Sequence, residues 1–97
     1  MVINVLDIVP ACNTAPQGQA IADAVRRALR SRHIVTLSFA GVTDVPSSFV
    51  NASIVALFHD RGIDEVRDRL MISNVTGQIS AMIRRCLANS QRNNEAA

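Results

Sequence analysis

VTLSFAGVTDVPSSFVNASIVALF, residues 35–58, reads as a buried strand, a short loop and an apolar helix in direct succession. The run from Val35 to Phe39 is rich in β-branched and apolar residues, and we interpret it as a central strand covered on both faces. Pro46 and the serines that follow it, Ser47 and Ser48, form a helix start signal. We therefore expect the function of this chain at the serine pair, where strand turns into helix.

Strands and helices are predicted to alternate along the rest of the chain. Pro10 ends a first apolar run, and Gly62 is well suited to end the helix that follows the serines. We predict strands at 2–9, 33–39 and 69–73, and helices at 19–32, 49–61 and 75–87, the last one capped by Ser73 or Asn74. Residues 11–18 are predicted to form a loop, and 63–68 a short charged connection.

This order of elements predicts the fold class. Alternating strands and helices favour an α/β fold, β-α-β-α-β-α, with a small, mainly parallel sheet covered by helices. Segment 33–39 is expected inside the sheet, with the other two strands beside it. The carboxyl ends of the strands, where such folds place their sites, carry residues 39–48 and 73–76. Seven apolar residues are expected in the core: Val35, Leu37, Phe39, Ile54, Leu57, Ile79 and Ile83.

Length and composition predict one globular domain. The 97 residues are 48% hydrophobic, with no run approaching the ~20 apolar residues of a membrane span. We expect a single domain over residues 1–90 and a polar C-terminal tail over 91–97. Residues 1–9 lack the basic start and the small-residue cleavage site of a signal peptide, which favours a cytoplasmic protein.

Several classes of site are not expected from the residues present. Cys12 and Cys86 are too few for a disulfide framework, and with His33 and His59 they make no metal-ligand cluster. The formal net charge of +2 and the absence of Trp and Tyr do not favour nucleic acid as a partner. The chain also lacks a glycine-rich phosphate loop and a Gly-x-Ser-x-Gly elbow, so we expect no cofactor and no catalytic residues.

Residues 38–42 read SFAGV, and residues 46–49 read PSSF. These motifs resemble the STAS domain, the fold of the bacterial anti-sigma factor antagonists. The resemblance is closest to a divergent STAS-like family of unassigned function, which commonly reads Asp-Phe-x-Gly-Val followed by Ser-Phe. Gly18 and Asn74 also fit that family, and the resemblance covers roughly residues 14–90.

The resemblance to the antagonists implies a partner and a switch. In the antagonists, a partner with a histidine-kinase-type ATPase fold phosphorylates the serine that aligns with Ser48, and this breaks the complex. The resemblance therefore makes Ser48 the phosphorylation candidate, with Ser47 as the alternative. Ser38 replaces the strand aspartate of the antagonists, Pro46 replaces the aspartate of the phosphorylation turn, and Phe49 replaces its glycine.

Two features leave alternatives open. Ser47 and Ser48 serve either as simple helix caps or, in addition, as a modifiable site. On the second helix, Phe49, Ser53 and Ala56 are expected on a partly exposed, low-charge flank that another surface can approach closely. The alternative is that the first or the third helix of the chain covers this flank.

The sequence predicts a small regulatory or adaptor module that binds a protein partner and is not an enzyme. The expected partner-binding residues are Asp44 in the loop and Phe49, Ser53 and Ala56 on the second helix, and the same flank could serve a homodimer. The alternative function is a small-molecule or lipid-binding sensor of the STAS type, with its ligand in the apolar layer under the second helix.

Overall fold

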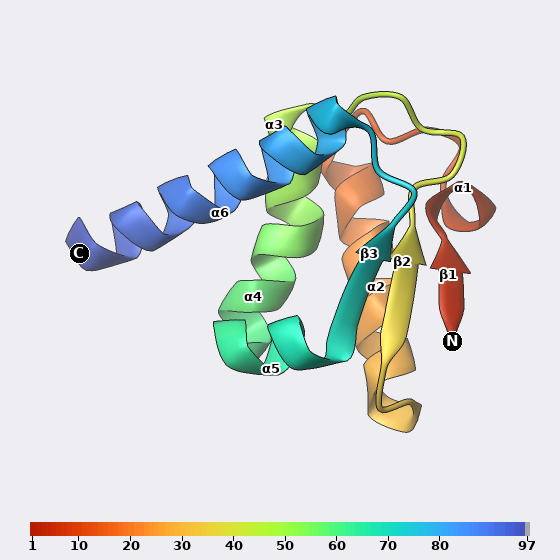
Figure 1. Ribbon diagram of the computed structural model, residues 1–97, viewed down its shortest axis with the longest axis horizontal. Coiled ribbons are helices and arrows are strands. Elements are labelled where there is room, and N and C mark those ends of the chain that lie inside the picture. Colours follow the sequence, from red (N-terminus) through yellow and green to blue (C-terminus); the bar gives the residue numbers. More distant parts are fainter. Residues whose placement is uncertain (97) are drawn as a thin grey trace.

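A computed structural model describes the backbone of residues 1–96 and the side chains of residues 1–62 and 64–90. It forms a two-layer α/β domain in which a small sheet packs against helices (Figure 1). The strands are β1 (Val2–Asn4), β2 (Val35–Ser38) and β3 (Leu70–Ser73). The helical segments are α1 (Val5–Ile8), α2 (Ala15–Ser31), α3 (Ser47–Val50), η1 (Asn51–Val55), α4 (Ala56–Arg61), α5 (Ile63–Arg69) and α6 (Gly77–Ala96).

The three strands are parallel and lie in the order β1-β2-β3, which confirms the predicted α/β fold with segment 33–39 in the centre. The register places Ile3, Leu37 and Ile72 side by side on one face of the sheet. Leu37 is fully buried there, and Ile72 packs against the core. This face therefore carries the helices.

The described residues leave the opposite face of the sheet uncovered. The next row of the register consists of Val2, Thr36 and Met71, and Val2 and Met71 are 63% and 53% exposed. The expectation that β2 is covered on both faces is therefore wrong. Residues 35–39 alternate between the two faces: Val35, Leu37 and Phe39 face the helices, and Thr36 and Ser38 lie on the other side. Ser38 is nevertheless buried, and its hydroxyl accepts a hydrogen bond from the Ala40 amide.

The first strand is shorter than predicted, because the chain leaves the sheet after Asn4 and forms the single turn α1. Only three residue pairs join β1 to β2, Val2 to Thr36 through Asn4 to Ser38. The apolar residues of segment 2–9 therefore serve two purposes. Val5 and Val9 enter the core, whereas Leu6 and Ile8 are exposed.

Helix α2 begins four residues before the predicted start at Gln19, inside the predicted loop 11–18. The Thr14 hydroxyl accepts a hydrogen bond from the Gln17 amide, and the Gln17 side chain accepts one from the Thr14 amide. This reciprocal capping box starts the helix, and Pro16 is tolerated because it lies in the first turn. Gly18 lies within this helix, and glycine is required there because a Cβ would lie 2.4 Å from the Phe49 carbonyl oxygen.

The predicted second helix is present and contains a π-helical turn. Segments α3, η1 and α4 follow one another without a break, and we call them together the α3–α4 helix. The π-helical turn η1 lies directly after Val50. Ser53 is buried and donates its hydroxyl hydrogen bond back to the Phe49 carbonyl at 2.8 Å, a pattern that commonly bends helices. Gly62 ends the helix with a positive φ of 88°, as predicted.

Two later elements differ from the prediction. The charged connection 63–68 is the helix α5, in which acidic Asp64 and Glu65 occupy the first turn and Arg67 and Arg69 the last, as the helix dipole favours. The cap of α6 is Thr76 and not Ser73 or Asn74, because the Thr76 hydroxyl accepts from the Ile79 amide at 3.2 Å. The backbone of α6 continues as helix to Ala96, through residues expected to form the polar tail.

The core confirms the predicted buried set. Val35, Leu37, Phe39, Ile54, Leu57, Ile79 and Ile83 are all buried. Phe39 and Phe49 meet edge to face, with 6.4 Å between ring centroids, at the junction of sheet and helices. Among the helices of the described residues, none is long and apolar enough to cross a membrane.

Candidate functional site

The carboxyl ends of β2 and β3 are joined by a small polar contact. The Ser38 hydroxyl, only 2% exposed, accepts a hydrogen bond from the Asn74 side-chain amide at 2.9 Å and one from the Ala40 amide at 3.3 Å. Asn74 has a positive φ of 56°, a conformation that asparagine adopts more readily than most residues. These hydrogen bonds hold the carboxyl ends of β2 and β3 together, so the loops that follow the two strands begin at fixed positions.

The loop after β2 is held in place by the start of α6. The Gln78 side chain accepts from the Val45 amide and donates to the Val45 carbonyl, both at 2.9 Å, as a neighbouring strand would. The Thr76 hydroxyl donates to the Thr43 carbonyl at 2.7 Å. Because Val45 is also buried, residues 39–46 have a defined path, although most of their surface faces solvent.

The two serines lie in the first turn of α3, and both are exposed. The residue in the N-cap position is Pro46, and no side chain among the described residues makes a capping hydrogen bond there. The interpretation of Ser47 or Ser48 as a helix cap is therefore wrong, because the helix begins one residue earlier than a serine cap requires. The exposure of Ser48 agrees with the expected accessibility of its hydroxyl, and its phosphorylation stays a prediction.

Asp44 is exposed on the clamped loop, two residues before Pro46. It lies between two shallow hollows: one of about 210 Å³ shared with Asn13 and Cys12, and one of about 380 Å³ shared with Pro46 and Gln78. Asp44, Ser47 and Ser48 thus form one continuous exposed end of the molecule, which we call the loop–helix surface (residues 40–48).

The prediction of a partly exposed flank on the second helix is wrong for two of its three residues. Phe49 and Ser53 are fully buried, and only Ala56 is half-buried. Helix α2 covers this flank, because Gly18 allows the two helix backbones to approach each other closely. The alternative that the first helix covers the flank is therefore confirmed, and Phe49 and Ser53 are not accessible to a partner.

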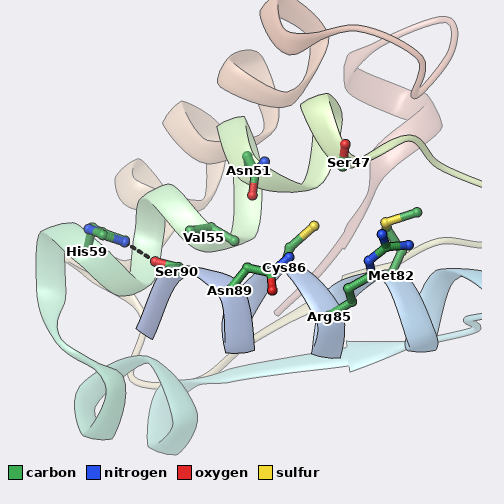
Figure 2. A pocket seen from close by; sticks show the side chains of 9 residues that line it. All are labelled: Ser47, Asn51, Val55, His59, Met82, Arg85, Cys86, Asn89 and Ser90. Carbon is green, nitrogen blue, oxygen red and sulfur yellow. Dashed lines mark hydrogen bonds between the residues drawn. The ribbon is translucent and has the colours of Figure 1, made fainter. Parts of the chain in front are cut away.

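A groove of about 550 Å³ lies between the α3–α4 helix and α6 (Figure 2). Ser47, Asn51, Val55 and His59, spaced four residues apart, line one wall. The facing wall is the side of α6 that carries Met82, Arg85, Cys86, Asn89 and Ser90. A contact between the His59 ring and the Ser90 hydroxyl closes one end. The sequence pattern did not indicate this groove.

Both cysteines are buried and free, as expected for a chain without a disulfide framework. Burial raises the pKa of the Cys12 thiol. Burial also raises the pKa of the Cys86 thiol, against the opposing effect of the neighbouring Arg85 guanidinium. Both groups are therefore protonated at neutral pH and poorly suited to act as nucleophiles.

The two histidines lie away from the loop–helix surface. His33 lies before β2, at the amino end of the sheet, and His59 lies at the far end of the groove. The described structure therefore places neither next to Ser48, as the sequence predicted. That the domain works without catalysis stays a prediction.

Comparisons with known proteins identify the family. Residues 17–79 match the family described as "STAS-like domain of unknown function (DUF4325)". A search of curated proteins finds no match, and neither does a search of solved structures. The matched segment runs from α2 to the first residues of α6 and includes the loop–helix surface. With well over half of its length matched and the expected parallel α/β fold, this chain belongs to the STAS-like domain family of unknown function.

Proposed function

We propose that the domain is a small regulatory or adaptor module that acts by binding a protein partner through the loop–helix surface. The observation that carries this proposal is the clamp on the loop. Gln78 holds the backbone of Val45, and Thr76 holds the backbone of Thr43. Asp44, which lies between these two anchored residues, is exposed, and so is Ser48, which follows them. A surface that is ordered before binding loses less conformational entropy in a complex, and this favours recognition.

The proposed partner is a protein with a histidine-kinase-type ATPase fold, by analogy with the anti-sigma factor antagonists. Ser48 is the proposed switch, because it is exposed in the first helical turn and its hydroxyl makes no capping bond. A phosphate there would add about −1.5 to −2 charges. The helix N-terminus favours that charge, so the domain stays folded, while the penalty falls on the partner interface. The proposed setting is the cytoplasm, and the proposed mode of action is binding without catalysis.

The variant Ser48→Asp should keep its melting temperature and lose partner affinity, because a carboxylate is tolerated in the first helical turn but not in a buried contact. Affinity capture from a lysate of the host, followed by mass spectrometry, identifies the partner. Calorimetry on the purified pair then measures the change in the dissociation constant.

The matched control is Ser48→Ala, which removes the hydroxyl without adding charge. Since Ser48 caps nothing, this variant should change stability by less than about 0.5 kcal/mol and preserve the complex. Equal affinities for the aspartate and alanine variants would show that Ser48 lies outside the interface. A partner that turns out to be a second copy of the chain would appear as concentration-dependent mass in light scattering.

The alternative function is binding of a small molecule, and the groove beside α6 supports it. The layer under the second helix, where a ligand is expected from the sequence, is filled by Val50, Ile54 and Leu57, all fully buried. The groove of about 550 Å³ on the other side of the same helix has the volume of typical ligand sites. A ligand retained through purification and seen by native mass spectrometry would favour this alternative.

A further inference from the structure

We propose that the groove between the α3–α4 helix and α6 binds a soluble small molecule that carries a phosphate or carboxylate head group and a short apolar body. This inference deepens the small-molecule alternative and does not depend on the partner surface. Its experiment uses purified protein alone, so its failure and a failure of partner binding are distinguishable.

Both walls of the groove carry hydrogen-bond donors. Ser47 and Asn51 contribute a hydroxyl and an amide from the α3–α4 helix, and Arg85 and Asn89 contribute a guanidinium and an amide from α6 (Figure 2). In the described part of the chain, none of these four side chains makes a hydrogen bond to another residue. Their donors are therefore available to a ligand.

The charge of the groove favours an anion. Arg85 is the one formal charge among the described lining residues, which include no carboxylate, and it has no ion pair among the described side chains. Two nearby acidic groups are engaged elsewhere: Asp60 of α4 pairs with Arg26, and Glu65 of α5 pairs with Arg61 and Arg69. A guanidinium binds phosphate or carboxylate through two parallel hydrogen bonds, which suits a small head group.

Three lining residues of the groove are apolar, and one of them belongs to the π-helical turn. Val55, Met82 and Cys86 line the space beside the polar groups, and Val55 and Cys86 are buried. Val55 is the last residue of η1, and single π-helical turns occur frequently at functional sites. These side chains can contact the apolar body of a ligand with a few carbons. A free inorganic anion would make no such contact, so we expect a ligand with an apolar part.

The test probe is hexyl phosphate, titrated into the purified ¹⁵N-labelled protein and followed by amide chemical shifts. We expect saturable shifts at Asn51, Arg85 and Asn89, and binding at least tenfold weaker for neutral hexanol. The variant Arg85→Gln should weaken hexyl phosphate binding roughly tenfold or more, because the charge-assisted hydrogen bonds of the guanidinium are lost. The variant Asn51→Asp, which puts a carboxylate on the opposite wall, should weaken it as well.

The matched control is Arg84→Gln, which removes the same charge from the neighbouring exposed residue of α6 that does not line the groove. It should leave the affinity within about twofold of the wild type. Equal weakening by Arg84→Gln and Arg85→Gln, or the absence of saturable shifts in the groove, would overturn the proposal. Binding to vesicles containing phosphatidic acid without binding to hexyl phosphate would also overturn it, because the ligand would then be a membrane surface.

Discussion

Replacement of Gly18 by alanine should strongly destabilise the domain, although it adds only one methyl group. The added Cβ would lie 2.4 Å from the Phe49 carbonyl oxygen and 3.0 Å from the Ala52 Cβ. The clashing atom belongs to the backbone of the α3–α4 helix, so a side-chain rotation cannot relieve the contact. We expect a loss of about 3 kcal/mol in the free energy of unfolding, the upper end for overpacking a core. Thermal denaturation should show a decrease of roughly 10–20 °C in melting temperature.

The matched control for this variant is Gly77→Ala at the start of α6. Among the described residues, no atom beyond its chain neighbours and its own helical turn lies within 4 Å of a Cβ built on Gly77, and the φ of Gly77 is not positive. Alanine there should leave stability unchanged or raise it by up to about 1 kcal/mol, because alanine is the better helix former. If both alanine variants melted at the wild-type temperature, the close packing of α2 on the α3–α4 helix would be contradicted.

The variant Arg69→Ala should produce the second large loss of stability, because Arg69 holds the end of α2. The Nη2 atom of its guanidinium donates to the backbone carbonyls of Leu29 at 2.6 Å and Arg32 at 3.0 Å, and the Nε atom donates to that of His33 at 3.0 Å. It also pairs with Glu65 at 2.9 Å. Removal of the side chain leaves three carbonyl groups without this donor. We expect a loss of about 2–3 kcal/mol, measured by urea denaturation.

Two variants separate this role of Arg69 from a general charge effect. Arg67→Ala removes an exposed arginine from the same last turn of α5 and should change stability by less than about 0.5 kcal/mol. Arg69→Lys keeps the charge but lacks the planar fork, so it should recover only part of the loss. Full recovery by lysine would mean that charge alone matters and that the three carbonyl contacts contribute little.

The sequence predicts the sheet and the position of the core because those patterns are local. The central strand Val35–Ser38 and the end of the second long helix at Gly62 both follow from residue types in short stretches of sequence. The start of α2 is not predicted correctly, because Pro16 and Gly18 indicate a loop when read alone. Proline is equally suited to a first helical turn, and the need for Gly18 arises from Phe49, thirty-one positions away.

The candidate site could be predicted only in part. The exposed serines after Pro46 follow from the loop and helix pattern. The burial of Phe49 and Ser53 does not follow, because an apolar helix flank looks the same whether a partner or another helix of the same chain covers it. Gln78 looks like a solvent-facing helix residue in the sequence, and its hydrogen bonds to Val45 exist only through a contact across 33 positions.

The charge of Asp44 offers the most direct test of the loop–helix surface. Asp44→Arg reverses the charge of an exposed loop residue, so the domain should remain folded. Asp68→Arg makes the same change on α5, at the opposite end of the molecule (Figure 1), and serves as the matched control. The dissociation constant of the captured partner, measured by calorimetry for wild type and both variants, decides the question.

Binding of a protein partner through the loop–helix surface predicts that Asp44→Arg weakens the complex by about tenfold or more, because a reversed charge meets groups selected for the opposite sign. It also predicts that Asp68→Arg stays within about twofold of the wild type. The same dissociation constant for all three proteins, or a loss confined to Asp68→Arg, would contradict the account.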